Sequence, residues 1–344
     1  MKKMIYLCGN DGTDARVVKE LRSYSKKYSV FFIGVKGPEP FIHDRIQHKL
    51  FPGSHKNIFT ILKMNLLLLS FFLKRCKYER VHIVDEQFYF FFIPVLFLTQ
   101  INKTLDIFDS IFLKKDFAFN KAYLLKKYIY GSVDKIIVTD ENRLEMLPDF
   151  AKKKAIIIPN VPFRNAQFDK EKPYRKGALT IAYFGTLLRN RGSEFMEEII
   201  RADKKIKFLL AGWVGDNYTK ELISKHVGSI EYFGTISQDQ ANDLLFNRSD
   251  YILCIYPFNN LNNINASPNK IYDSILTKTP VIMNSEIKVS NLVRKLNIGY
   301  LFSFSNFEIM KLIGDLNNNK NNYRISNSLS RNYEWENYEE ILIS

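Results

Sequence analysis

The stretch Ser267-Pro268-Asn269-Lys270-Ile271-Tyr272-Asp273, which continues to Thr279-Pro280-Val281-Ile282, follows an apolar run at residues 251–255. The apolar run predicts a buried strand, and the Asn-rich residues 259–265 predict a loop. Ser267 is a natural N-cap, and Pro268 suits the first position of a helix because its missing N–H costs nothing there. The stretch therefore predicts a strand, a polar loop and a helix in immediate succession.

The start of this predicted helix combines groups that attract an anion. Free backbone N–H groups and the helix dipole favour negative charge, and Lys270 adds a full positive charge on the first turn. Asp273 lies one turn later, where a carboxylate can accept a hydrogen bond from a ribose hydroxyl. The pattern indicates a site for a nucleotide sugar, and an ordinary capped helix after a buried strand is the alternative.

Strand-like and helix-like segments alternate along the whole chain of 344 residues. Such alternation predicts parallel sheets flanked by helices, and the length suits two domains. The first set of predicted strands lies at residues 4–8, 29–35, 80–84, 103–108, 135–139 and 155–158. The second set lies at 179–184, 207–211, 230–233, 251–255 and 280–283. We expect an α/β protein with two Rossmann-like domains, at residues 1–165 and 166–330, and a C-terminal helix at 331–344 that crosses back to the first domain.

Charge is distributed unevenly between the two halves of the chain. The net charge is +14, and residues 1–168 carry 28 Lys and Arg against 16 Asp and Glu. A basic half indicates a polyanionic partner, and no nucleic-acid module is recognisable, so an anionic membrane surface is the better prediction. The longest apolar stretch, residues 88–99, is about half the length of a membrane span. Three scattered cysteines, with no disulfide or zinc spacing, favour the cytoplasm, and we expect a peripheral protein at the inner face of the cell membrane.

Several strand ends and the tail resemble those of GT-B glycosyltransferases, specifically the retaining glycosyltransferase family 4 and its close relatives. The segments that carry the resemblance, beside 267–282, are residues 157–161 (IIPNV), 182–186 (AYFGT) with Arg191-Gly192, 208–212 (FLLAG), 230–234 (IEYFG) and 332–335 (NYEW). The resemblance implies the GT-B fold, in which two Rossmann-like domains face each other across a cleft. It also implies transfer of a sugar from a nucleotide-diphosphate donor with retention of configuration.

The resemblance also implies which residues hold the donor. These are Gly185, Arg189, Arg191, Gly234, Asn265, Ser267, Asn269, Lys270 and Asp273, and the turn with Gly9 and Gly12 after the first strand can face the same ligand. Three positions depart from the family pattern: Thr186 stands where a cation is expected, Asn265 where an acid is expected, and Phe108 where a histidine is common. No Asp-x-Asp pair is present, so we expect no metal and no cofactor, with cations and amides stabilising the diphosphate instead.

The remaining candidates lie in the first half. Glu86 and Asp109 follow predicted strands, where a carboxylate can orient or deprotonate an acceptor hydroxyl, although a lone carboxylate at a strand end is more often a helix cap or part of a loop salt bridge. Lys114, Lys115, Lys126 and Lys127 alternate with aromatic residues, which is typical of a membrane-surface helix, or of a helix with a solvated basic face.

The sequence thus predicts a glycosyltransferase that uses a nucleotide sugar and an acceptor, with a lipid-linked bacterial surface glycan as the expected acceptor. A nucleotide-sugar 2-epimerase on the same frame is one alternative. A non-catalytic binding or scaffold subunit is the other, and Asn265, Thr186 and Phe108 are its evidence. The nucleobase, sugar, acceptor and linkage are not specified by the sequence.

Overall fold

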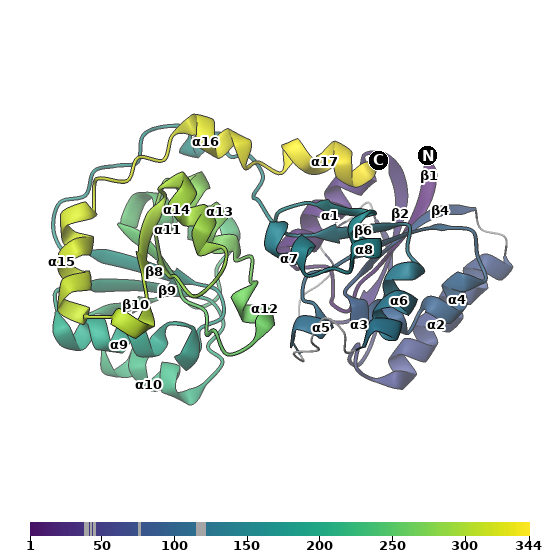
Figure 1. Cartoon of the computed structure of the whole chain (residues 1–344), viewed down its shortest axis with the longest axis horizontal. Helices are drawn as coiled ribbons and strands as arrows, with labels where there is room; N and C mark the ends of the chain where they lie inside the picture. Colours follow the sequence, from purple (N-terminus) through teal and green to yellow (C-terminus); the bar gives the residue numbers. More distant parts are fainter. Residues whose placement is uncertain (38–40, 42, 44–45, 75–76, 115–121) are drawn as a thin grey trace. The chain divides into compact units, whose positions relative to one another are not determined.

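A computed structural model describes residues 1–37, 41, 43, 46–74, 77–114 and 122–344. The chain divides into two compact units (Figure 1): unit 1 comprises Met1–Pro159 and Tyr338–Ser344, and unit 2 comprises Asn160–Asn337. The sequence placed this boundary at residue 165. It assigned residues 331–344 to a helix that returns to the first domain, and the last seven residues do belong to unit 1.

Unit 1 is built on a parallel sheet that has seven strands among the described residues, in the order β3-β2-β1-β4-β5-β6-β7. The strands are β1 (Lys2–Leu7), β2 (Tyr28–Val35), β3 (Gln47–Phe51), β4 (Tyr78–Val84), β5 (Asn102–Asp106), β6 (Lys135–Val138) and β7 (Ala155–Ile157). The helices are α1 (Ala15–Ser25), α2 (Ile58–Leu73), α3 (Glu86–Phe90), α4 (Ile93–Phe97), α5 (Ile111–Lys114), α6 (Tyr123–Gly131), α7 (Glu141–Glu145), α8 (Asp149–Lys152) and α17 (Glu336–Ile343), the last of which continues from unit 2.

Unit 2 has a second parallel sheet, with strand order β10-β9-β8-β11-β12-β13 in the described residues. Its strands are β8 (Thr180–Phe184), β9 (Lys207–Ala211), β10 (Ile230–Tyr232), β11 (Tyr251–Cys254), β12 (Val281–Asn284) and β13 (Gly299–Phe302). Its α-helices are α9 (Ser193–Ala202), α10 (Asn217–Lys225), α11 (Gln238–Arg248), α12 (Leu261–Ile264), α13 (Asn269–Thr277), α14 (Ser290–Leu296), α15 (Ile309–Asn319) and α16 (Asn327–Asn332). Short 3-10 turns lie at Ala166–Phe168, Arg189–Arg191 and Phe304–Asn306.

The central strands are buried over most of their length because helices cover both faces of each sheet. In β1, Met4, Ile5, Tyr6 and Leu7 are all fully buried, and the same holds for most of β11 and β12. Two edge strands were not predicted. β3 has three exposed residues of five, so its sequence is too polar to resemble a strand, and β13 has four residues and begins at a glycine. Both are strands only because a neighbour pairs with them.

The C-terminal segment is bonded to unit 1 by several contacts. Leu342 is fully buried, and Glu339 accepts hydrogen bonds from Ser23 and Lys26 of the α1 region. Arg80 and Lys135 donate to the last carbonyl groups. None of the helices in the described part of the chain is both long enough and apolar enough to cross a membrane.

Candidate functional site

The sheet of unit 2 reverses its strand order between β8 and β11. From β8 the chain builds outward to β9 and β10, then returns to β11 and builds outward in the other direction. Loops that leave the carboxyl ends of β8 and β11 therefore diverge, and open α/β sheets bind ligands in the crevice that results. This topology directs attention to the residues after Phe184 and after Cys254, independently of any motif.

Glycine is required where β8 and β9 end. Gly185 and Gly212 have φ values of +116° and +124°, in the region that side chains disfavour. A Cβ added to Gly212 would overlap the carbonyl oxygen of Gly185, so the two loops approach too closely for any side chain. Gly212 N–H donates to Gly234 O (2.7 Å), and thus three of the glycines at the strand ends lie in a row. Their small size leaves backbone groups accessible at the edge of the sheet.

Lys270 lies beside this row of glycines. It is on the first turn of α13, and its Nζ would be 3.6 Å from a Cβ added to Gly185. The ammonium group also lies 5.0 Å from the centre of the Tyr183 ring. Lys270 is half-buried, and this burial lowers its pKa; nearby Arg191 acts in the same direction. The lysine thus crosses from α13 to the end of β8, at the point of strand reversal.

Arg191 supplies a second cation at the same place. Its guanidinium group lies 5.0 Å from the centre of the Tyr256 ring, on the loop after β11. Among the described residues, neither Arg191 nor Lys270 forms an ion pair or a hydrogen bond through its side chain. Two half-buried cations held close together repel each other, although the negative charge of Asp273 acts against this effect at Lys270, and an anion between the cations would remove that repulsion. Tyr183 and Tyr256, which position these cations, were not recognised from the sequence.

Arg189, in contrast, is already paired. Its guanidinium group donates to Glu194 (2.8 Å) and lies 4.8 Å from the Tyr218 ring centre, on the exposed surface. Its backbone N–H donates to Asp216. The structure therefore brings Arg191, but not Arg189, to Lys270. Thr186 is exposed and accepts a hydrogen bond from Tyr183 through its carbonyl oxygen.

The start of α13 differs from the prediction. Pro268, not Ser267, is the N-cap, because its ψ of 134° is extended rather than helical. No side chain caps the helix, and the Ser267 hydroxyl is buried with no hydrogen-bond partner in the described structure. Asn269, the first helical residue, accepts a hydrogen bond from Asn160 (2.6 Å). The amides at the helix start are consequently not used by a serine cap.

Asp273 and Asn265 lie on either side of that helix start. Asp273 is half-buried on α13 and accepts a hydrogen bond from Gln238 at 3.2 Å. Asn265 is buried; its amide donates to Leu261 O (2.8 Å), and its Oδ1 has no partner within the described residues. An amide oxygen left unpaired in this way is an acceptor still available to a hydroxyl group.

At the carboxyl end of the unit 1 sheet, Gly9 and Gly12 follow β1. A Cβ on Gly9 would lie 3.1 Å from the His55 side chain, and Gly12 has a φ of +87°. Both glycines shape a tight turn whose N–H and carboxylate groups bond within the loop: Gly12 N–H donates to Asn10 and Thr13 donates to Asp11.

Glu86 is fully buried rather than exposed to an acceptor. Its carboxylate accepts hydrogen bonds from the Ser110 hydroxyl, the Ile111 N–H (2.7 Å) and the Tyr130 hydroxyl, which together hold the start of α5. Burial raises its pKa to about 7. These contacts favour a positioning role for Glu86 over direct contact with an acceptor.

Asp85 lies directly after β4 and Asp109 lies in the loop after β5, and hydrogen bonds join the two segments. Asp109 is exposed and pairs with Lys114 (2.9 Å). Asp85 accepts hydrogen bonds from the N–H groups of Phe108 and Asp109, and burial raises its pKa to about 7. Its φ of +67° is strained for a residue other than glycine, and such strain is concentrated at functional sites. No feature of the sequence marks this conformation.

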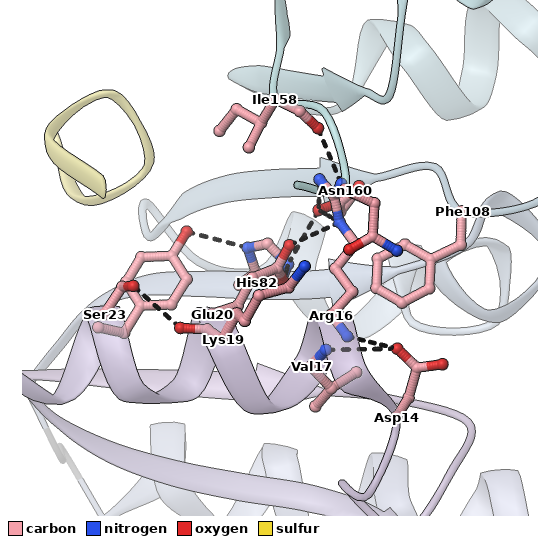
Figure 2. A network of polar contacts seen from close by, with 12 residues as sticks. Asp14, Arg16, Val17, Lys19, Glu20, Ser23, His82, Phe108, Ile158 and Asn160 are labelled. Atoms are coloured by element: carbon pink, nitrogen blue, oxygen red, sulfur yellow. Dashed lines mark hydrogen bonds and ion pairs between the residues drawn. The ribbon is translucent and has the colours of Figure 1, made fainter. Parts of the chain in front are cut away.

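A buried polar network joins helix α1 to strands β4 and β5 and to Ile158 in unit 1 (Figure 2). Arg16 pairs with Glu20 (2.9 Å) and Asp106 (2.9 Å) and donates to Ile158 O, while His82 lies 3.0 Å from Glu20. Glu20, His82 and Asp106 are close enough to hold a metal ion. However, the guanidinium group of Arg16 already supplies the positive charge that these two carboxylates need. Burial lowers the His82 pKa to about 3, so the imidazole is neutral and the network is structural.

The four predicted membrane lysines are in different environments. Lys126 is buried, with its Nζ 5.2 Å from the Phe112 ring centre, and burial lowers its pKa. Lys114 is paired with Asp109, and Lys127 is exposed on α6. Lys115 lies outside the described residues. Lys126 therefore cannot contact a lipid surface in this structure, which corrects one of the four expectations.

Comparison with known proteins gives structural neighbours only. No family model and no curated protein matches the sequence. HepE from Anabaena, solved with UDP and glucose, has 13% identity and a TM-score of 0.72, covering 99% of this chain and 98% of its own. Sucrose-phosphate synthase from Thermosynechococcus elongatus has 12% identity and a TM-score of 0.71, with 99% and 97% covered. WaaG, a glycosyltransferase involved in lipopolysaccharide biosynthesis, has 11% identity and a TM-score of 0.62, with 98% and 95% covered.

These likenesses extend over nearly the full length of each chain, so they concern the whole arrangement of strands and helices rather than a shared motif. Both sheets of this chain are parallel and flanked by helices, as the sequence predicted. Identities this low establish architecture and leave activity open. The chain has the GT-B fold.

Proposed function

We propose that this protein transfers a sugar from a nucleotide-diphosphate sugar to an acceptor. The observation that carries the proposal is the pair of unpaired cations, Lys270 and Arg191, beside the glycine row at the strand reversal of unit 2. A diphosphate leaving group gains negative charge as the glycosidic bond breaks, and fixed cations in a half-buried site stabilise that charge. Asp273, one turn along α13, is placed to accept a hydrogen bond from the ribose.

UDP is the first nucleotide to test, because HepE was solved with UDP and with UDP-glucose. For the acceptor we propose a lipid-linked bacterial surface glycan, made at the inner face of the cell membrane. The basic first half of the chain supports this choice, and the role of WaaG in lipopolysaccharide biosynthesis is consistent with it. The presence of Lys270, Arg191 and Asp273 argues against a scaffold subunit that binds no nucleotide, since such a subunit has no need of these residues.

Retention of configuration and independence of metal are parts of the same proposal. Retention rests on the family resemblance alone. Metal independence rests on Arg191, Lys270 and the uncapped start of α13, which provide the positive charge that Mg²⁺ supplies in other sugar transferases.

Calorimetric titration tests the donor site directly. UDP and UDP-glucose should bind and should raise the melting temperature by mass action, inorganic diphosphate should bind more weakly, and uridine should bind weakest of all. Sugar release or transfer should continue in excess EDTA. Failure of every nucleoside diphosphate to bind would overturn the proposed function, and loss of activity in EDTA that Mg²⁺ restores would overturn only its metal independence.

A further inference from the structure

One side of unit 1 exposes large apolar side chains from consecutive helices. On α2, Ile61, Met64 and Leu68 pack into the core, whereas Phe59, Leu62, Leu66 and Leu73 face outward. The exposed fractions of Phe59 and Leu73 are 70% and 74%. A helix that is apolar on both faces is unusual at a protein–water boundary, and a large exposed apolar patch marks a contact surface.

The exposed residues of α2 are continuous with those of two neighbouring segments. Asn65 of α2 donates to Phe91 O, and α2 packs against α4, where Phe97 and Leu98 are exposed. Phe90 of α3 meets Tyr128 of α6 at 6.1 Å between ring centres, and α6 exposes Leu124. Figure 1 shows α2, α4 and α6 along one side of unit 1. We call this surface the apolar strip: Ile58, Phe59, Leu62, Leu66, Leu73, Phe97, Leu98 and Leu124.

The charged residues on the helices that carry the apolar strip are of one sign. Lys56, Lys63 and Lys74 are exposed on or beside α2, and Lys127 is exposed on α6. The segments α2, α4 and α6 contain no Asp or Glu. Apolar side chains with lysines at their margin complement an anionic bilayer surface, in which rings and leucines enter the acyl boundary and ammonium groups remain among the headgroups.

We propose that the apolar strip is a membrane-insertion surface for anionic lipid. The 16 residues of α2 span roughly 24 Å, which is too short to cross a bilayer but suits a helix lying in its plane. A second copy of the chain fits less well, since a twofold contact would oppose lysine to lysine. The proposal refines the membrane partner of the proposed function. The main contact with the membrane is then made by the leucines and phenylalanines of α2 and α4. Lys114 and Lys126 do not make it, because Lys114 is paired and Lys126 is buried.

Vesicle sedimentation with the full chain, without nucleotide or acceptor, tests the inference. The wild-type protein should bind vesicles of phosphatidylglycerol and phosphatidylcholine. A triple variant with Phe59→Ser, Leu62→Ser and Leu66→Ser should partition to these vesicles at least about tenfold more weakly, because each substitution removes apolar contact area. The matched control is Val227→Ser with Met310→Ser, which removes exposed apolar side chains from unit 2 and should bind like wild type.

Depth of insertion gives a second readout that does not depend on affinity. Leu66→Trp and Phe97→Trp should be quenched by brominated acyl chains, and Val227→Trp should not. Equal vesicle binding by the triple variant, or absence of quenching at both strip positions, would overturn the proposal. So would a wild-type dimer, seen by light scattering, that the triple variant abolishes. UDP titration of the same variants separates these outcomes from failure of the donor site.

Discussion

At the residue scale, Lys270 shows how a charge can be prepared for a ligand. Its ammonium group is half-buried between the Gly185 backbone and the Tyr183 ring, and its side chain forms no ion pair or hydrogen bond with a described residue. Its pKa is lowered because burial and Arg191 both disfavour the charged form. A bound diphosphate would stabilise the charged form of Lys270, so ligand binding recovers free energy that the empty site lacks.

We expect Lys270→Ala to weaken UDP binding about ten- to a hundredfold, which corresponds to roughly 1.5–3 kcal/mol for a charge-assisted contact. The melting temperature without ligand should stay the same or rise, because an unfavourably buried charge is removed. Lys311→Ala, at an exposed position on α15, is the control and should leave affinity unchanged. An unaltered calorimetric dissociation constant for Lys270→Ala would remove the lysine from the site.

Glu86 provides a prediction about pH at the same scale. Its pKa is about 7 in the folded chain and close to 4.5 when unfolded, so the folded state holds the proton more tightly. Its contribution to stability is therefore full below about pH 4.5 and is lost as the pH rises to 7. The free energy of unfolding of the wild-type protein, measured with urea, should fall between pH 5 and pH 8. We expect this fall to be smaller in Glu86→Gln by about 1–3 kcal/mol. An identical pH dependence in both proteins would show that Glu86 is ionised in the fold.

At the element scale, the loops after β8 and β9 depend on each other. Gly185 N–H donates to Ala211 O, and Gly212 has no room for a side chain beside Gly185. The donor site is therefore built from the contact of two strand ends rather than from one loop. A substitution at Gly212, directly after β9, should therefore displace Gly185 and with it the neighbouring Lys270 side chain, although residues 212 and 270 are distant in sequence.

Gly212→Ala should consequently lower both stability and UDP affinity. Gly177 is the matched control: it also has a positive φ, +105°, but a Cβ there would meet no atom within 4 Å. Gly177→Ala should cost only the backbone strain, of order 1–3 kcal/mol in the free energy of unfolding, and should bind UDP normally. If both variants lose the same stability and neither loses affinity, the close approach of the two loops has no role in the site.

At the scale of the whole molecule, unit 1 is formed by two separate parts of the chain, residues 1–159 and residues 338–344. Residues 338–344 bury Leu342 and bond to Ser23, Lys26, Arg80 and Lys135 of unit 1. Unit 1 is thus completed by residues far from it in sequence, whereas the Lys270 cluster lies wholly within unit 2.

A chain that ends at Asn337 should therefore lose stability in unit 1 alone. Calorimetry should show a lower-temperature transition that UDP does not shift, followed by one that UDP still raises. Leu342→Ala should lower the temperature of the same transition less than the truncation does. The expected loss in the free energy of unfolding is about 2–5 kcal/mol, since the leucine is fully buried. A single UDP-sensitive transition in the truncated chain would mean that the units do not unfold separately.

The sequence alone determined the alternation of apolar strands and amphipathic helices, and with it the α/β class and the two parallel sheets, because those patterns are local. It also singled out Lys270 and Asp273, since a strand, loop and helix start are adjacent in the chain, and Arg191 through the family resemblance. Tertiary structure decided what each polar side chain can reach. Glu86 and Lys126 are buried, Arg189 is paired, and Arg16 contacts Ile158, 142 residues away. Burial and pairing depend on contacts between distant residues, which no local pattern contains. For the same reason, only the fold could show that no described residue covers the outward face of α2.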